Sequence, residues 1–461
     1  MDTRGRLTEA FDTWSAWADA QAGDDSRHAV LAEHLRAGRP FSHPAYAGHL
    51  VRPPLRAALL GLLAATLVDP EDRACDDEST TAALEDEVVA GLAAMFGPAT
   101  WHGQLTSGGD IAALEALRAA REAHPEVGIA HSADGYGAHE RMCELLRVPA
   151  YSVSVDTAGR MDPDALVTVL RRERVGTVVV TAGTTTLGAV DPIADILPLC
   201  HEHGVRVHVD AGYGGFFTLL ADAEELRGTP AARHLRAIAD CDSVLVDPHR
   251  QGLHPNPCGV LLVRAGDGDE DGEEQPGSVA RRLPGVFDPD RARSGSPAAA
   301  LWLTLRALPP TTDGLGEVLV TGLRGARRWR DLIDAEPELM LYQEPELDVL
   351  TFVPLTGEPH PRMSSVTAAG RHMLRADTGG AQHPAHLSTS SVRVLDFVRR
   401  HPRAVADRNE AHILRGALLR PDAAAHVERV HERVTALAAA APRRPRPPGP
   451  PPHSQPVESA V

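Results

Sequence analysis

Strand-like and helix-like segments alternate along residues 100–265, and this alternation constrains the fold more than any other feature of the sequence. Apolar runs predict strands at residues 127–132, 148–156, 175–183, 205–212, 244–247 and 260–263. Between them, helices are predicted at 110–122, 137–147, 162–173 and 192–203. Repeated strand–helix units predict a mostly parallel sheet covered by helices, which places the chain in the α/β class.

The flanking sequence divides the rest of the chain into further parts. Residues 1–75 are predicted to form an N-terminal helical segment, with a helix in the Leu/Ala run after Pro53-Pro54. The remaining parts are a large α/β domain at 76–300, a smaller α+β domain at 301–440 and a disordered, proline-rich tail at 441–461.

Composition excludes several classes of function. The net charge of −17 argues against nucleic acid or an anionic membrane as the main partner. No apolar run is long enough to span a bilayer, and the N-terminus lacks the apolar region of a secretory signal. The five cysteines are scattered without CxxC spacing, so we expect a cytoplasmic chain with no disulfide frame and no metal site.

A glycine-rich turn in LTSGGDIAALEALRAAR, residues 105–121, places Ser107, Gly108 and Gly109 between a strand and a helix. Free backbone N–H groups and the helix dipole at such a position bind phosphate or another anion. Glycine before a helix also occurs as a plain tight turn, so this stretch alone leaves both interpretations open.

Two more turns follow predicted strands. In VHVDAGYGGFF, residues 207–217, Asp210 ends a buried strand, at the edge where open α/β sheets bind ligands. A buried carboxylate needs a partner, either a protonated nitrogen of a ligand or a salt bridge or cap within the protein. In TAGTTTLGAVDPI, residues 181–193, Asp191 follows a hydroxyl-rich turn and suits a helix cap.

The stretch VLVDPHRQGLHPNPCGVLLV, residues 244–263, places two strands around a loop that carries Asp247, His249 and Arg250. Loops held by a rigid scaffold often carry binding and catalytic residues. This loop is therefore a candidate site that presents a cation to a ligand.

Taken in order, these motifs resemble the group II pyridoxal-phosphate-dependent decarboxylases, such as the aromatic-amino-acid, tyrosine and glutamate decarboxylases. The order is the GG turn, TAGTTxxGAxDP, HVDAxYGG and DPHxxG, with HPAYAGH upstream and ALW downstream. The resemblance covers about 40–440 and implies the aspartate-aminotransferase-like fold (fold type I). It also implies pyridoxal 5′-phosphate (PLP) as cofactor, an amino acid or derivative as substrate, and a dimer with active sites at the subunit interface.

The resemblance also implies roles for individual residues. Asp210 would face the PLP ring nitrogen, Thr185 would lie near the ring, and Tyr136 occupies the position of the family's stacked histidine. The other cofactor-binding positions are Ser107, Gly108, Gly109, Asp247 and His249, and the catalytic positions are His249 and Arg250.

The chain departs from the family at the Schiff-base lysine. In the family a lysine follows DPH, whereas here Arg250 does, and the whole sequence contains no lysine. A guanidinium has a pKa above roughly 12 and no free lone pair, so it cannot form the covalent link. Any PLP would therefore be held non-covalently.

Two other departures lie nearby. Asp110 replaces the threonine of the family's SGGT motif, and about 5 Å from a phosphate it would be repelled by roughly 3 kcal/mol per unit charge. The family's mobile loop often supplies a proton-donating tyrosine, but no tyrosine occurs between Tyr213 and Tyr342. The corresponding stretch is an acidic loop at 265–277.

Three functions remain open from the sequence. The first is an atypical decarboxylase in which the substrate amine reacts with PLP that is bound non-covalently. The second is a pseudoenzyme that forms a homodimer, or a heterodimer with a lysine-bearing paralogue. The third is a repurposed site without PLP chemistry, which a lysine-free chain would suit if it handled an amine-reactive compound; a plain arginine bias explains the composition equally well.

Overall fold

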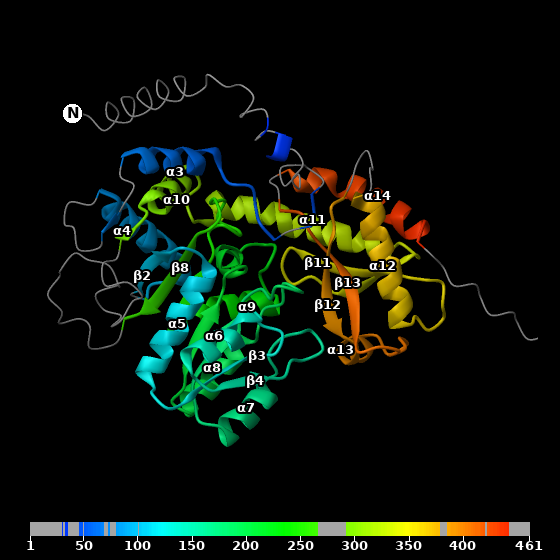
Figure 1. Cartoon of the computed structure of the whole chain (residues 1–461), viewed down its shortest axis with the longest axis horizontal. Coiled ribbons are helices and arrows are strands. Elements are labelled where there is room, and N and C mark those ends of the chain that lie inside the picture. Colours follow the sequence, from blue (N-terminus) through cyan, green and yellow to red (C-terminus); the bar gives the residue numbers. More distant parts are fainter. Residues whose placement is uncertain are drawn as a thin grey trace, which may run out of the picture.

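The computed structural model describes residues 30, 33–35, 46–48, 50–68, 72–73, 80–99, 101–265, 292–378, 385–419 and 422–441. Within these residues a large region holds the N-terminal and central segments, and a smaller region holds the C-terminal segments (Figure 1). The predicted acidic loop at 265–277, apart from residue 265, and the predicted tail beyond 441 lie outside the described residues.

A seven-stranded sheet forms the centre of the large region, in the order β2-β8-β7-β6-β5-β3-β4. Its strands are β2 (Trp101–Thr106), β3 (Gly128–Ser132), β4 (Ala150–Val153), β5 (Val175–Thr181), β6 (Arg206–Asp210), β7 (Ser243–Val246) and β8 (Gly259–Arg264). The strands from β7 to β4 are parallel, whereas β8 is antiparallel to both β7 and β2. The α/β class predicted from the alternating segments is confirmed.

The strand sequences explain their central place. β5, Val-Gly-Thr-Val-Val-Val-Thr, is buried along almost its whole length, because helices cover a parallel sheet on both faces. Its neighbour β6 pairs with it in register, with Val178 opposite Val207 and Thr181 opposite Asp210. This register brings Asp210 and the turn after β5 to the same edge of the sheet.

Helices α5 (Gly109–Ala123), α6 (Ala138–Leu146), α7 (Pro163–Arg172) and α8 (Ile193–Glu202) pack on strands of this sheet, and α9 (Pro230–Arg236) packs against α8. The start of α7 follows from its sequence, since the Asp162 carboxylate accepts hydrogen bonds from the Asp164 and Ala165 N–H groups. Pro163 occupies the first helical position, where no N–H donor is needed. α5 packs over β5, β6, β7 and β8.

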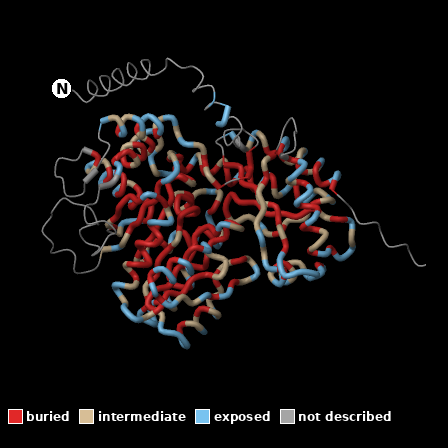
Figure 2. The backbone as a smooth tube through the Cα atoms, viewed as in Figure 1, coloured by how far each residue is buried: buried red, intermediate tan, exposed pale blue. Residues whose placement is uncertain are grey.

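The C-terminal region contains a four-stranded antiparallel sheet in the order β10-β11-β13-β12. The strands are β10 (Leu339–Gln343), β11 (Val349–Pro354), β12 (Ser388–Arg393) and β13 (Glu410–Ala417), and the helices are α11 (Glu317–Asp334), α12 (Met363–Thr378), α13 (Val394–Arg400) and α14 (Val427–Ala439). A separate apolar core of this region includes Trp329, Phe352 and Leu414. Figure 2 shows that many residues of this region are buried.

N-terminal segments pack beside the large sheet. The helix predicted after Pro53-Pro54 is present as α3 (Arg56–Val68), which lies against α10 (Ser296–Ala307). α4 (Thr80–Ala93) also contacts α10, and two short strands, β1 (Asp72–Arg73) and β9 (Ala292–Arg293), pair with each other. No helix among the described residues is long and apolar enough to cross a membrane.

Candidate functional site

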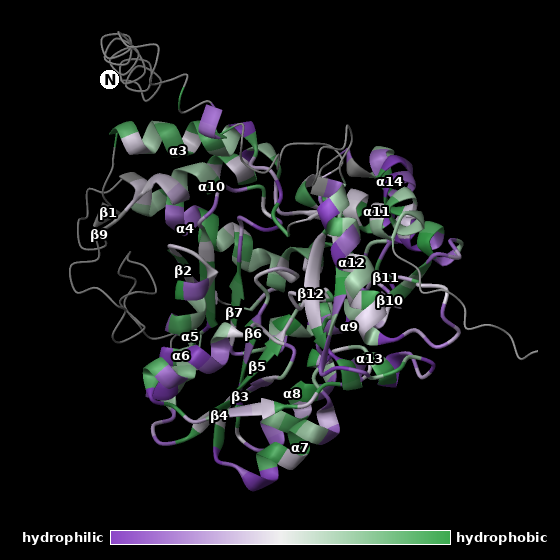
Figure 3. Ribbon diagram, turned by 45° about the vertical axis from the view of Figure 1, so that its right-hand side comes forward, coloured by the Kyte–Doolittle hydropathy of each residue, from purple (hydrophilic) through white to green (hydrophobic). Residues whose placement is uncertain are grey.

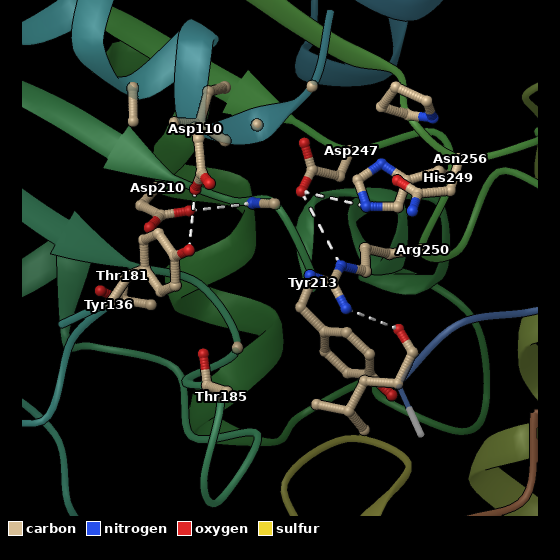
Figure 4. Close-up of a pocket in the computed structure, with 18 of the residues that line it drawn as sticks. Asp110, Tyr136, Thr181, Thr185, Asp210, Tyr213, Asp247, His249, Arg250 and Asn256 are labelled. Carbon is tan, nitrogen blue, oxygen red and sulfur yellow. Dashed lines mark hydrogen bonds and ion pairs between the residues drawn. The ribbon is translucent and has the colours of Figure 1, made fainter. Parts of the chain in front are cut away.

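A cavity of about 280 Å³ opens at the carboxyl edge of the large sheet, close to the lower end of typical ligand pockets. The turns that follow β2, β3, β5, β6 and β7 converge on it (Figure 4). Every site residue predicted from the sequence lines this cavity: Ser107, Gly108, Gly109, Tyr136, Thr185, Asp210, Asp247, His249 and Arg250.

The glycine turn before α5 brings the backbone close to the loop after β7. Gly108 has a φ of 131°, a conformation that residues with a side chain rarely adopt. A Cβ on Gly109 would overlap the Asp247 carboxylate, so a larger residue there would require that side chain to shift. The start of α5 and the Asp247 side chain therefore form one continuous wall of the cavity.

Asp210 is a carboxylate whose charge the protein supports. His139 Nε2 lies 3.1 Å from Asp210 Oδ2, and the Gly212 N–H donates to Oδ1 at 3.2 Å. Burial alone would raise the pKa of Asp210, but the hydrogen bond and charge of His139, with the Gly212 N–H, hold it below its ordinary value. Asp210 therefore presents a negative charge at the end of β6.

Tyr136 and Asp110 form a pair across the mouth of the cavity. The Tyr136 hydroxyl donates to Asp110 Oδ1 at 2.8 Å (Figure 4). The Tyr136 ring also meets the His139 ring edge-on. Burial and this bond raise the pKa of Tyr136 to about 12, so the hydroxyl keeps its proton at neutral pH. Asp110, which replaces the threonine of the family's SGGT motif, thus points toward the cavity and accepts a hydrogen bond from Tyr136.

Asp247 differs from Asp210 in having little to support a charge. Oδ1 is buried and has no hydrogen-bond partner among the described residues. Burial, followed by the nearby Asp210 charge, raises the pKa of Asp247 to about 8, and Arg250 opposes this shift only in part. At neutral pH this carboxyl is mostly protonated, so it can donate a hydrogen bond into the cavity.

His249 and Arg250 complete the loop after β7. His249 Nδ1 lies 2.7 Å from the carbonyl oxygen of Cys258, and burial lowers the pKa of this histidine, so it is neutral. Arg250 Nη1 donates to the Leu50 carbonyl at 3.4 Å, and Nε lies 3.9 Å from Asp247 Oδ2 (Figure 4). The Arg250 side chain is 39% exposed and keeps donors free for a ligand.

Sequence reasoning missed several residues of this site. His139 lies one helical turn after Tyr136, and its pairing with Asp210 had no signal in the sequence. Tyr213 also lines the cavity, and its hydroxyl donates at 2.5 Å to Asp348, a buried residue of the C-terminal region that pairs with Arg52. Such contacts join segments far apart in the chain, so only the folded structure identifies them.

Arg415 of β13 is a further cation beside the cavity. Its guanidinium donates to the carbonyl oxygen of Thr185 and to the Ser388 hydroxyl. Burial lowers the pKa of Arg415, and within the described residues no carboxylate forms an ion pair with it. Arg250 and Arg415 thus bring positive charge to the site from two different regions of the fold.

Comparison with known proteins agrees with this geometry. The family model of the pyridoxal-dependent decarboxylase conserved domain matches residues 80–268, which include the whole large sheet and the loop with Arg250. A probable L-tyrosine/L-aspartate decarboxylase of Methanothermobacter thermautotrophicus is 28% identical over 297 residues, which are 63% of this chain and 77% of that protein. An L-2,4-diaminobutyrate decarboxylase of Rhizobium meliloti is 32% identical over 260 residues, 51% of this chain and 50% of that protein. The match thus spans only about half the length of some relatives.

Solved structures share the fold. The crystal structure of mouse CSAD has a TM-score of 0.72 at 20% identity, covering 90% of this chain and 88% of that one. The glutamate decarboxylase domain of a Vibrio parahaemolyticus protein has a TM-score of 0.70 at 18% identity, covering 95% and 94%.

The large sheet, its helices and the smaller C-terminal region have the aspartate-aminotransferase-like fold (fold type I), as predicted. More narrowly, residues 80–268 match the pyridoxal-dependent decarboxylase conserved domain, and the chain is similar to amino-acid decarboxylases, as the motifs in its sequence predict. PLP is the cofactor that this family uses.

Proposed function

We propose that this chain binds PLP non-covalently and is impaired in the lysine-dependent decarboxylation of its family. One observation carries the proposal: the residue that follows Pro248-His249 and lines the cavity is Arg250, and the sequence contains no lysine that could replace it. A guanidinium remains protonated at any relevant pH and offers no lone pair for a covalent link.

The cavity nevertheless fits PLP by charge and hydrogen bonding. Asp210 carries the negative charge that a pyridinium nitrogen requires. The glycine turn at the start of α5 offers backbone N–H groups to a phosphate, and the protonated Asp247 offers an unpaired donor beside it. Thr181 Oγ1, which lines the cavity, is also buried without a hydrogen-bond partner. Unpaired buried groups of this kind favour a polar ligand.

Individual residues of this chain would have separate roles at the bound cofactor and substrate. When bound, PLP supplies an electron sink for negative charge at the substrate's α-carbon. Asp210 would keep the ring nitrogen charged, and Arg250 with Arg415 would bind and orient a substrate carboxylate. The Tyr136 hydroxyl keeps its proton and donates to Asp110. Arg250 cannot release product as a lysine at this position would, so turnover is expected to be low.

A subunit role is the second candidate, and the surface of α3 favours it. Leu59, Leu60, Leu63 and Val68 are between 36% and 51% exposed on this helix (Figure 3). Exposed apolar residues grouped on one helix mark a protein interface more often than isolated ones do. We infer a cytoplasmic homodimer, or a heterodimer with a lysine-bearing relative, in which Leu59, Leu60 and Leu63 are covered.

Calorimetric titration of the purified chain with PLP tests the proposal, followed by CO2 release from candidate amino acids. Names of the relatives suggest L-tyrosine, L-aspartate and L-2,4-diaminobutyrate as candidates. We expect saturable binding of PLP and CO2 release no faster than with free PLP. Turnover well above that level would contradict the impairment, and absence of PLP binding would indicate a repurposed site.

A further inference from the structure

A second cavity, of about 480 Å³, lies under the C-terminal half of α5. The first cavity uses the start of α5 and the carboxyl ends of the strands, whereas this one uses the end of α5 and the opposite edge of the sheet. Its floor comes from Thr177, Arg206, His208 and Ser243, which lie near the beginnings of β5, β6 and β7. The PLP site described above shares no lining residue with it.

Buried polar atoms in this cavity have no partner within the described residues. Thr177 and His208 are each 2% exposed, yet Thr177 Oγ1 and His208 Nε2 make no hydrogen bond. The other ring nitrogen, His208 Nδ1, lies 2.8 Å from Ser243 Oγ. Leaving a buried polar group without a hydrogen bond is unfavourable, so two such groups in one cavity point to a ligand that completes them.

The floor of this cavity carries a positive charge. Arg206 lines the cavity and, within the described residues, forms no ion pair. The one carboxylate in the lining, Glu122, is engaged by Arg118 at 2.8 Å and by Arg121 at 3.8 Å. Burial lowers the pKa of His208 to about 3, so its ring is neutral and contributes hydrogen bonding without charge.

The opposite wall is apolar and made of small side chains. α5 contributes Ala116, Ala119, Ala120 and Ala123, and β8 contributes Val263. Alanine leaves space between the helix and the sheet that larger apolar residues would fill. A ligand here would meet a cation, two hydrogen-bonding groups and a flat apolar surface.

We propose that this second cavity binds a small monocarboxylate with a compact apolar body. The carboxylate is held by Arg206, Thr177 and His208, and the apolar body packs against the alanines of α5. The site is independent of PLP binding, although both cavities share α5, and β6 carries His208 two residues before Asp210.

Benzoate is a suitable probe, with uncharged benzamide as its matched control, in calorimetric titrations of the full chain. We expect saturable benzoate binding near one molecule per chain, and benzamide binding at least tenfold weaker. Arg206→Gln and Thr177→Val should each weaken benzoate binding, the first at least tenfold, because it removes the charged donor of the site. Ala120→Leu, which fills the cavity, should abolish it.

Two control variants distinguish benzoate binding at this site from benzoate binding at other arginines. Arg172→Gln, on the exposed end of α7, and Arg250→Gln, in the first cavity, should leave benzoate affinity unchanged. Absence of saturable binding by the wild-type chain would overturn the proposal. So would benzoate binding that survives both Arg206→Gln and Ala120→Leu, or that Arg250→Gln removes, because the probe would then occupy another site.

Discussion

The two halves of the first cavity differ in how well they stabilise the negative charge of their carboxylates. At the end of β6, Asp210 has a histidine at 3.1 Å and a backbone N–H, and its charge is supported. In the loop after β7, Asp247 has an unpaired buried oxygen and a pKa raised to about 8, and the residue beside the family's histidine is Arg250. The half that would hold a cofactor ring is intact, whereas the half that would hold the covalent link is changed. Binding and covalent chemistry can therefore be tested separately.

The largest expected effect comes from restoring the nucleophile with Arg250→Lys. If the cavity has kept its shape, borohydride treatment with PLP should add about one PLP mass to each chain, against none in the wild type, because a lysine amine can form the link that a guanidinium cannot. Arg172→Lys is the matched control, since it adds one exposed lysine far from the cavity. Equal labelling of the two variants would show that position 250 no longer faces PLP.

Removing the charge of Asp210, in the other half of the cavity, should weaken the binding of PLP itself. Asp210→Asn is expected to weaken PLP binding by about 10–100-fold, because a hydrogen bond to a charged group contributes roughly 1.5–3 kcal/mol. Asp240→Asn, at an exposed position, is the control and should bind PLP as the wild type does. Calorimetric titration measures both, and unchanged affinity in Asp210→Asn would contradict the assigned role of this residue.

Asp247 predicts a pH dependence of stability without any ligand. The unfolded chain releases this proton near pH 3.8 and the folded chain near pH 8, so folding stability falls as the pH rises through this range. Asp247→Asn removes the effect and should gain about 3–4 kcal/mol relative to the wild type between pH 5 and pH 8, at about 1.36 kcal/mol per pKa unit. Urea unfolding at pH 5 and pH 8 measures it; a difference from wild type that does not grow with pH would contradict the raised pKa.

The smallest effect is expected at the mouth of the cavity. Asp110→Thr removes a carboxylate that faces the ligand space, and should tighten PLP binding by up to about tenfold, since solvent screens an exposed charge. Asp164→Asn, an exposed carboxylate in the first turn of α7, provides the control. PLP affinity measured at low and high salt should show that the gain from Asp110→Thr shrinks as the salt concentration rises. A gain that does not depend on salt would point to a change in the shape of the cavity instead.

Much of the large region was predictable because its signals are local. The apolar runs predicted β3, β5, β6, β7 and β8 to within about two residues, and parallel pairing then brought their following turns to one edge. β13 and α12 were not predicted. β13 has mixed burial and carries charged residues such as Arg415, so its strand character comes from pairing with β11 and β12.

The residues of the site were likewise predictable only where their signals are local. Residues that motifs place at strand ends, such as Asp210 and Arg250, were found from the sequence and line one cavity. Partners that come from elsewhere, such as His139 for Asp210 and Asp348 for Tyr213, were not found, because a contact between distant segments has no local pattern. The pKa of Asp247 depends on burial and on Asp210, and both are properties of the folded chain.

The central claim is that the wild-type chain holds PLP without a covalent link. Intact-mass spectrometry tests it most directly, on a wild-type sample saturated with PLP, treated with borohydride and then denatured. We expect PLP to be bound before denaturation and the chain afterwards to have its unmodified mass. A stoichiometric mass increase of one reduced PLP would contradict it, because another group of this chain would then serve as the anchor.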